Sequence, residues 1–412
     1  MNEATLNYVR QHAGDDVRKL ALQGVKDTDV DLTQALQQIA GRQTARRKLP
    51  SWAAVEGIVY PPHLNMEQCS SEQTAKYKAK IVNGKSVNGK SVNGKSVNDK
   101  FTDLTGGFGV DFYWISQSFQ QRCYIEQNEQ LCTISSENFH ALGLDCSVCC
   151  CDAVTYLTTM PHVDLIYMDP ARRNEHGGRT YSIEDCTPNV IELLPLLMEK
   201  ANRVMLKLSP MLDWRKATDD LKYVREAHIV SVDNECKELL LLLDKEATED
   251  LRVVCVNDDK TFEFFPSRGN TFSLTEQNGL SLAEKRPFSE SETAFLYEPN
   301  ASIMKAGCFK ELAERFSVHQ ISANSHLFLS SVEIDDFPGR GFQISSISSM
   351  NKQELRTALK DTDRANISVR NFPLTPDQLR KKMKLKDGGD VYIFATTTSD
   401  GAHRLYICRK IG

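Results

Sequence analysis

The chain has 412 residues and a net charge of −5, with 41% hydrophobic and 25% charged residues. This length exceeds the roughly 250–300 residues at which a single core stops growing, so we expect several domains. The charge excludes a globally basic nucleic-acid binder but not local basic patches, and no stretch approaches the roughly 20 apolar residues of a membrane helix.

Residues 1–64 read as a helical N-terminal segment. Its start shows no basic stretch followed by an apolar core, so we expect no secretory signal. Apolar residues recur at helical spacing between Asp31, a candidate helix cap, and Pro50, where the pattern ends. The same stretch carries a basic patch made of Arg42, Arg46, Arg47 and Lys48.

A further helix is expected in "CSSEQTAKYKAKIV", with Ser70 or Ser71 as its cap. It is followed by "NGKSVNGKSVNGKSVNDK", whose five-residue repeat matches no helical or solenoid unit and whose Asn-Gly steps favour turns. We therefore expect residues 83–99 to form a mobile surface insertion. Its lysines could contact a polyanion, although a solvated loop is the simpler interpretation.

From residue 101 the sequence alternates between short apolar strands and helical stretches, which is typical of βαβ units and a largely parallel sheet. The expected strands cover residues 101–105, 121–127, 145–152, 163–169, 203–209, 227–233 and 237–244. Only Asn-Glu-Cys separates the last two, so they should form an antiparallel hairpin. The predicted fold class is α/β, with a seven-stranded Rossmann-like sheet.

The rest of the chain is predicted to form two small α+β modules. Residues 251–345 combine short strands with the helix "ASIMKAGCFKELAERF", and residues 346–412 read helix, strand, helix, strand, strand. Thr375-Pro376 is a strong helix start, and a hairpin should turn near Asp400-Gly401. The helix after Thr375 carries a second basic patch, in which we single out Arg380, Lys381 and Lys384.

Twelve cysteines, three of them consecutive, favour a reducing cytoplasm over an oxidising compartment. Cys146 and Cys149 form a C-x-x-C pair. Zinc sites need four ligands, and no second Cys or His pair has a matching spacing. We therefore expect no bound metal.

The stretch "DLTGGFGVD" predicts a ligand-binding turn between a strand and a helix. An acid at the strand end would repel a phosphate but suits a ligand amino group, and S-adenosylmethionine carries an ammonium and a sulfonium and no phosphate. A tight structural turn is the alternative. The candidate residues are Asp103, Thr105, Gly106, Gly107 and Gly109.

Acids also end the next two strands. Glu126, about 20 residues after the glycine turn and followed by Gln127, could accept hydrogen bonds from both ribose hydroxyls of a nucleoside. Asp152 could accept a hydrogen bond from the adenine amino group, with the Ala153 amide near the ring. For Asp152 a simple helix cap is the alternative, and for Glu126 a solvated acid.

The fourth strand ends in "DPARR". Asp169-Pro170 cannot extend the strand, because proline supplies no donor for strand pairing, and in open α/β sheets this edge binds ligands. Asp169 could orient or deprotonate an acceptor group, and Arg172 or Arg173 could hold a substrate phosphate. Structural salt bridges are the alternative for the two arginines.

These motifs carry a family resemblance. Residues 65–245 resemble the class I S-adenosylmethionine-dependent methyltransferases, and "DPAR" is similar to the fourth motif of the RNA 5-methyluridine methyltransferases and to the D-P-P-Y motif of amino-group methyltransferases. With "QIAGRQTARRKLPSW", "YEPNASIMKAG" and "NSHLF", nearly the whole chain resembles a bacterial methyltransferase family with a ferredoxin-like middle domain and a C-terminal THUMP-like domain.

The resemblance implies S-adenosylmethionine as methyl donor and, because THUMP domains bind RNA, structured RNA as partner. The expected domains are the helical segment 1–64, the methyltransferase domain 65–248, the ferredoxin-like domain 249–345 and the THUMP-like domain 346–412. The 5-methyluridine enzymes use a cysteine after the fifth strand, where this chain has "LKLSPMLDW". We therefore favour transfer to nitrogen or oxygen over transfer to carbon.

Two other classes of function stay open. A nicotinamide-dependent oxidoreductase could use a related sheet, but the acid before Gly106 and the terminal hairpin disfavour it. A non-catalytic RNA-binding protein with a vestigial methyltransferase fold is disfavoured by the intact acids Asp103, Glu126 and Asp169.

Overall fold

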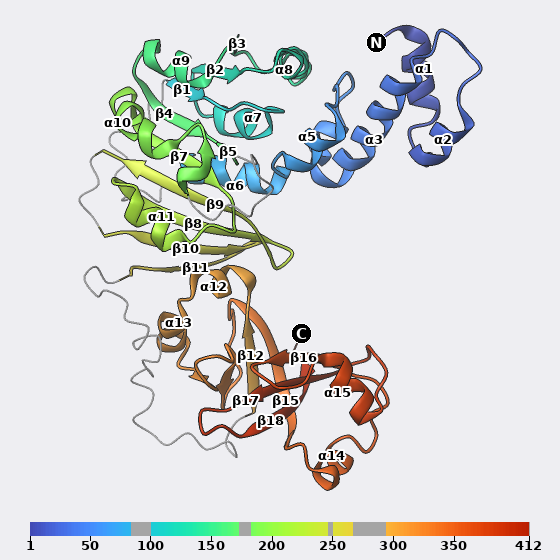
Figure 1. The fold of residues 1–412 in the computed structure, drawn as a ribbon, viewed down its shortest axis with the longest axis vertical. Helices are drawn as coiled ribbons and strands as arrows, with labels where there is room; N and C mark the ends of the chain where they lie inside the picture. The colour runs from blue at the N-terminus through green and yellow to red at the C-terminus, as the bar shows by residue number, and fades with distance from the viewer. Residues whose placement is uncertain (84–99, 173–182, 246–249, 267–293, 412) are drawn as a thin grey trace. The chain divides into compact units, whose positions relative to one another are not determined.

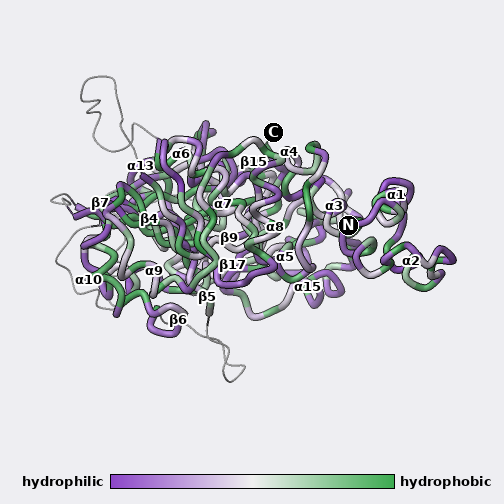
Figure 2. Tube along the Cα trace, turned by 90° about the horizontal axis from the view of Figure 1, so that it is seen from above, coloured by the Kyte–Doolittle hydropathy of each residue, from purple (hydrophilic) through white to green (hydrophobic). Residues whose placement is uncertain are grey.

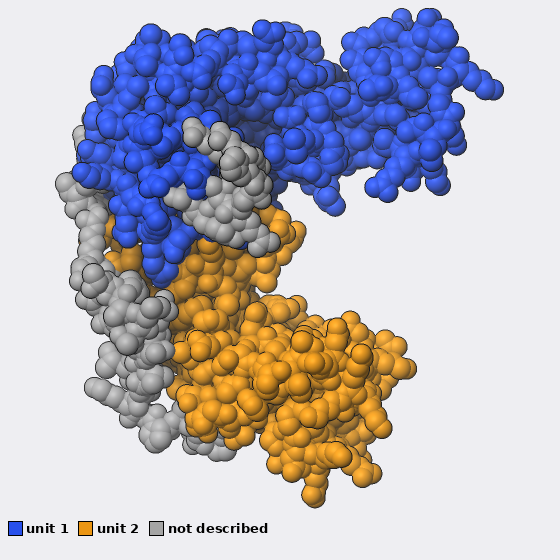
Figure 3. Space-filling model, in the orientation of Figure 1, with its two compact units in different colours: residues 1–225, 239–248 blue, residues 226–238, 249–412 orange. Residues whose placement is uncertain are grey.

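The computed structural model describes residues 1–83, 100–172, 183–245, 250–266 and 294–411. Its residue contacts divide the chain into two compact units (Figure 3). Unit 1 comprises residues 1–225 and 239–248, and unit 2 comprises residues 226–238 and 249–412. Apart from Asn83, the repeat insertion expected at 83–99 lies outside the described residues.

The N-terminal segment of unit 1 is helical, as predicted. Its helices are α1 (Glu3–Gln11), α2 (Val17–Gln23), α3 (Leu32–Lys48), α4 (Pro50–Ala53), α5 (His63–Gln68) and α6 (Glu72–Asn83). Asp31 caps α3 by accepting a hydrogen bond from the Gln34 amide at 3.0 Å. Hydrophilic and hydrophobic residues alternate along α1 and α2 (Figure 2).

A largely parallel sheet with helices between its strands follows (Figure 1). Its strands in unit 1 are β1 (Lys100–Asp103), β2 (Gln121–Glu126), β3 (Ser147–Cys150), β4 (Val163–Met168), β7 (Ala201–Leu208) and most of β9 (Glu235–Asp244). Its helices are α7 (Val110–Ser116), α8 (Glu129–Ala141), α9 (Ala153–Thr159), α10 (Val190–Lys200) and α11 (Trp214–Asp220). Neighbouring strands from β7 through β4, β1 and β2 to β3 are parallel, and β9 pairs antiparallel with β7.

The sheet has nine strands rather than the predicted seven, in the order β11-β10-β8-β9-β7-β4-β1-β2-β3. All seven expected strands are present, and β8 (Val224–Val232) joins β9 through Asp233 and Asn234, which both have positive φ. The extra strands are β10 (Arg252–Asn257) and β11 (Lys260–Phe264), which the sequence analysis placed in the next module. The partner of a short apolar strand is a tertiary property, so its pattern could not assign β10 to this sheet.

The C-terminal part of unit 2 forms one further sheet, in the order β13-β14-β12-β15-β18-β17-β16. Its strands are β12 (Phe295–Pro299), β13 (His319–Gln320), β14 (Phe328–Ser330), β15 (Gly339–Ser348), β16 (Asn366–Arg370), β17 (Val391–Thr397) and β18 (His403–Lys410). Its helices are α12 (Ala301–Ala306), α13 (Phe309–Phe316), α14 (Lys352–Ala358) and α15 (Pro376–Met383). The single helix predicted over 301–316 is therefore two helices, because Gly307 adopts a left-handed conformation at φ +66°.

Aromatic side chains pack beneath the first strands of unit 1. The rings of Phe112, Tyr124 and Phe139 lie with centroids 5.0–5.5 Å apart, and the Phe101 ring stacks on that of Phe112 at 5.7 Å. The Tyr124 and Phe139 rings lie against Gly106 and Gly109, so the glycine-rich turn after β1 packs on this cluster. Within the described parts of the chain, no helix combines the length and apolar character needed to cross a membrane.

Candidate active site

Four acids predicted from the sequence lie along one edge of the sheet of unit 1. β4, β1, β2 and β3 are consecutive parallel neighbours, and all of them end at the same edge. The acids that end or follow these strands, in this order, are Asp169, Asp103, Glu126 and Asp152. Strand order therefore brings together residues that are up to 66 positions apart in the chain, counting from 103 to 169.

The glycine-rich turn requires its glycines. A Cβ at Gly106 would lie 2.1 Å from the Tyr124 ring, and one at Gly109, where φ is +82°, would lie 2.6 Å from the Phe139 ring. At Gly107, where φ is +56°, a Cβ would meet only the Thr105 carbonyl oxygen, at 3.9 Å. The turn is thus closely packed on its inner side and open at Gly107.

Glu126 connects the turn to the end of β2. Its Oε2 accepts a hydrogen bond from the Gly107 amide at 2.8 Å, and its Oε1 accepts one from the Asn128 amide at 2.8 Å. The carboxylate is half-buried, whereas Gln127 beside it is exposed. Glu126 is consequently fixed in one orientation beside the open side of the turn.

Asp103 is almost completely buried, with 1% of its surface exposed. Burial, together with the nearby carboxylates of Asp111, Asp169 and Glu126, raises the pKa of its carboxyl well above the ordinary value, although the Thr105 amide donates to Oδ1 at 2.9 Å. An additional positive charge near this carboxyl would compensate its burial. The edge therefore has the electrostatic character that suits a cationic ligand.

Asp152 caps α9. Its Oδ1 accepts from the amide and the hydroxyl of Thr155, at 2.8 and 2.9 Å, and these bonds lower the pKa of the carboxyl. The side chain is exposed, and Ala153 after it is the first residue of α9. The capping alternative is thus present in the structure, and a ligand contact stays a prediction.

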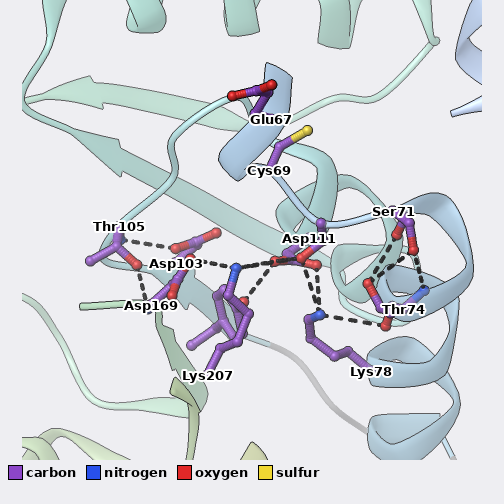
Figure 4. Close-up of polar contacts among 12 residues, drawn as sticks. Glu67, Cys69, Ser71, Thr74, Lys78, Asp103, Thr105, Asp111, Asp169 and Lys207 are labelled. Atoms are coloured by element: carbon purple, nitrogen blue, oxygen red, sulfur yellow. Dashed lines mark hydrogen bonds and ion pairs between the residues drawn. The ribbon is translucent and has the colours of Figure 1, made fainter. Parts of the chain in front are cut away.

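Asp169 follows β4 and is held from two directions (Figure 4). Its amide donates to the Thr105 hydroxyl at 2.6 Å, which ties it to the glycine-rich turn, and its Oδ2 lies 2.5 Å from the Lys207 Nζ. Pro170 after it is buried. Arg173 and the side chain of Arg172 lie outside the described residues.

A buried charge array extends from Asp169 into the interior of unit 1 (Figure 4). Asp111, on α7, lies 3.8 Å from the Lys207 Nζ and 3.2 Å from the Nζ of the fully buried Lys78. It also accepts hydrogen bonds from the Ser70 and Tyr167 hydroxyls, each at 2.7 Å. Burial alone would raise the pKa of Asp111, but the two lysines and two hydroxyls outweigh it and lower the pKa.

No sequence motif predicts a role at this site for Lys78 or Asp111. One signal was available, because Lys78 shares the helical face of Ala75, Ala79 and Val82, where a cation must find an anion if the face is buried. The structure also decides the cap of α6: the Thr74 amide donates to the Ser71 hydroxyl at 3.2 Å, while Ser70 contacts Asp111.

The basic residues predicted on α15 belong to unit 2 and differ in their surroundings. Arg380 is paired with Asp377 at 2.7 Å and with Asp387 at 2.5 Å, whereas Lys381 and Lys384 are exposed. Thr375 and Gln378 form the capping box that starts this helix. The two lysines are therefore more accessible to a polyanion than the arginine.

Comparisons with known proteins identify the family. Residues 295–338 match a family model for a ferredoxin-like domain, and residues 339–410 match one for a THUMP domain-like region. A solved structure from Porphyromonas gingivalis W83, described as a methyltransferase, is 30% identical, with a TM-score of 0.82 and coverage of 99% of this chain and 98% of that chain. The chain belongs to this methyltransferase family.

Curated relatives agree with this assignment. Two uncharacterised S-adenosylmethionine-dependent methyltransferases, from the Mycobacterium tuberculosis strains CDC 1551 and H37Rv, are each 23% identical over 287 residues, which cover 67% of this chain and 72% of the relative. The family resemblance and the fold class inferred from the sequence are confirmed. Asp103, Glu126 and Asp169 form what we call the acidic edge of the sheet in unit 1.

Proposed function

We propose that this methyltransferase transfers a methyl group from S-adenosylmethionine to a nitrogen or oxygen of a nucleotide in structured RNA. The observation that carries the RNA assignment is the THUMP-like match over residues 339–410, since THUMP domains are RNA-binding modules. The exposed lysines Lys381 and Lys384 lie within this region and support it.

The strand edge supports the donor site. We assign the ammonium of the donor to a position near Asp103, because a cationic partner would compensate the burial of this carboxyl. We assign the ribose hydroxyls of the donor to Glu126 and Gln127. The open side of Gly107 allows close approach of a ligand to the backbone. Oδ2 of Asp152 would accept a hydrogen bond from the adenine amino group, and the Ala153 amide would lie near the adenine ring.

When bound, S-adenosylmethionine supplies an electrophilic methyl group on its sulfonium. Asp169, which the Thr105 hydroxyl and Lys207 hold at the same edge, would accept the proton that the acceptor nitrogen or oxygen loses as its new bond to carbon forms. Transfer to carbon through a covalent intermediate is disfavoured. The hydroxyl of Ser209, after β7, accepts from the Met211 amide at 3.2 Å and is a poor nucleophile without a base.

Transfer of tritium from labelled donor to fractionated total RNA and total protein tests this function. We expect label in a structured RNA fraction with the native protein and none with Asp169→Ala. Label in protein alone would contradict the RNA assignment. RNA binding without any transfer would favour the vestigial alternative. We also propose a cytoplasmic location, which the twelve cysteines, three of them consecutive, support.

A further inference from the structure

Lys207 is the cation nearest to the acid of the "DPAR" motif among the ion pairs of the described residues. It lies on β7, the neighbour of β4, with its Nζ 2.5 Å from Asp169 Oδ2. The Lys207 side chain is 12% exposed, whereas that of Asp169 is 37% exposed. A largely buried ammonium retains an anionic partner because burial without one is costly, so the ion pair with Lys207 restrains the Asp169 carboxylate.

The position of Lys207 is itself fixed from the interior. Asp111 lies 3.8 Å from its Nζ, and the Ser70 hydroxyl lies 3.5 Å from it. Asp111 is in turn anchored by the fully buried Lys78 and by the Tyr167 hydroxyl. Charges alternate along this array, from Lys78 through Asp111 and Lys207 to Asp169, so each member is held by an opposite neighbour.

We propose that Lys207 is a positioning residue for methyl transfer, which fixes the Asp169 carboxylate so that Oδ1 faces the acceptor group. The proposal rests on the proposed function of Asp169 as proton acceptor. Lys207 engages Oδ2 and acts through Asp169, not on the substrate. Displacing a reacting group by about 1 Å can cost about 100-fold in rate, so loss of this restraint should be visible in turnover.

The kinetic test uses labelled S-adenosylmethionine and the RNA fraction that the native protein methylates. Lys207→Met should lower kcat about 100-fold while KM for the donor changes less than about threefold, and Lys207→Arg, which keeps the charge, should restore most of kcat. Because Lys207 acts through Asp169, the double variant with Asp169→Asn should be no slower than Asp169→Asn alone. Multiplied losses would contradict the proposal.

The matched control is Lys216→Met. Lys216 lies on α11 with its Nζ also 2.5 Å from a carboxylate, that of Asp220, but it is 55% exposed and is not a member of the charge array. We expect its kcat to equal that of the native protein. If Lys207→Met does not fold, Lys207→Gln replaces it, since glutamine retains a polar end without the charge.

Crystal structures of the native protein and the variants provide a readout that needs no substrate. The Asp169 carboxylate should keep one rotamer in the native protein, in Lys207→Arg and in Lys216→Met, and should change or multiply its rotamers in Lys207→Met. An unchanged Asp169 in Lys207→Met would overturn the proposal. If the native protein transfers no methyl group, the proposed function fails, while the rotamer of Asp169 still decides whether Lys207 positions it.

Discussion

Glu126 has one observed role, in the glycine-rich turn, and one proposed role, in donor binding. It accepts hydrogen bonds from the Gly107 and Asn128 amides and is proposed to accept the donor ribose hydroxyls. Glu126→Ala should therefore weaken S-adenosylmethionine binding by about 1–3 kcal/mol, the usual cost of polar groups left without a partner. Isothermal titration calorimetry measures this change.

Two controls separate the binding role of Glu126 from a structural one. Glu137→Ala removes an exposed acid on α8, the helix that follows β2. This variant should bind S-adenosylmethionine with the native affinity. Circular dichroism shows whether Glu126→Ala keeps its fold. A folded Glu126→Ala variant with native affinity would exclude the ribose role.

The buried carboxylate of Asp103 should lower the stability of the protein and at the same time strengthen donor binding. Burial raises the pKa of its carboxyl well above the ordinary value of about 3.9, so the native state binds more protons than the unfolded state between the two values. The stability that the protonated Asp103 carboxyl contributes is complete below the pKa that this group has in the unfolded chain. It is lost as pH rises through the raised pKa of the folded protein. Asp103→Asn, which has the same shape without the charge, should remove this loss.

Thermal unfolding of native and Asp103→Asn protein across pH 4–8 provides the measurement. The variant should melt at a higher temperature than the native protein at pH 8, and the difference should shrink toward pH 4. It should also bind S-adenosylmethionine more weakly, because the donor ammonium would lose its carboxylate. Equal melting temperatures at pH 8 would show that the buried carboxyl carries no penalty.

Helix α9 allows the cap role of Asp152 to be separated from its proposed adenine contact. Oδ1 accepts from the Thr155 amide and hydroxyl, so Asp152→Ala should cost about 1 kcal/mol of stability through loss of the cap. Asp152→Ser keeps a capping oxygen but shortens the side chain. It should match the native protein in chemical denaturation and yet bind the donor more weakly. Native donor affinity in the serine variant would leave Asp152 as a cap alone.

The elements that were predictable from the sequence are those whose signals are local. Asp103 and Asp169 each end an apolar run, and parallel strands place such ends at the same edge of a sheet. The proximity of these acids could therefore be predicted from the sequence alone. The break at Gly307 and the attachment of β10 were missed. The contact between Lys207 and Asp169 depends on which strand neighbours β4, which periodicity does not specify.

At the scale of the whole chain, the proposed chemistry and the lysines proposed to bind RNA belong to different units. The acidic edge lies in unit 1, whereas Lys381 on α15 and Lys384 at the end of that helix lie in unit 2. With a net charge of −5, the protein as a whole does not attract a polyanion. Affinity for RNA therefore has to come from local patches, and removal of a patch should change binding without changing the donor site.

Replacement of Lys381 and Lys384 by Gln tests this separation. Each phosphate contact contributes about 0.7–0.9 units to the slope of log affinity against log salt, so the double variant should bind RNA more weakly with a slope flatter by roughly 1.5 units. Arg380→Gln should have a smaller effect on the slope, because Asp377 and Asp387 already engage its guanidinium. Filter binding at several salt concentrations measures both.

A substitution at Asp169 completes the test, because it should remove methyl transfer and leave the exposed lysines in place. Asp169→Ala should abolish methyl transfer while RNA affinity and its salt slope stay native, and the double lysine variant should keep native S-adenosylmethionine affinity. If the lysine variant binds RNA with the affinity and slope of the native protein, α15 is not the RNA-binding element. The basic patch of α3, with Arg42, Arg46 and Arg47, would then be the next surface to substitute.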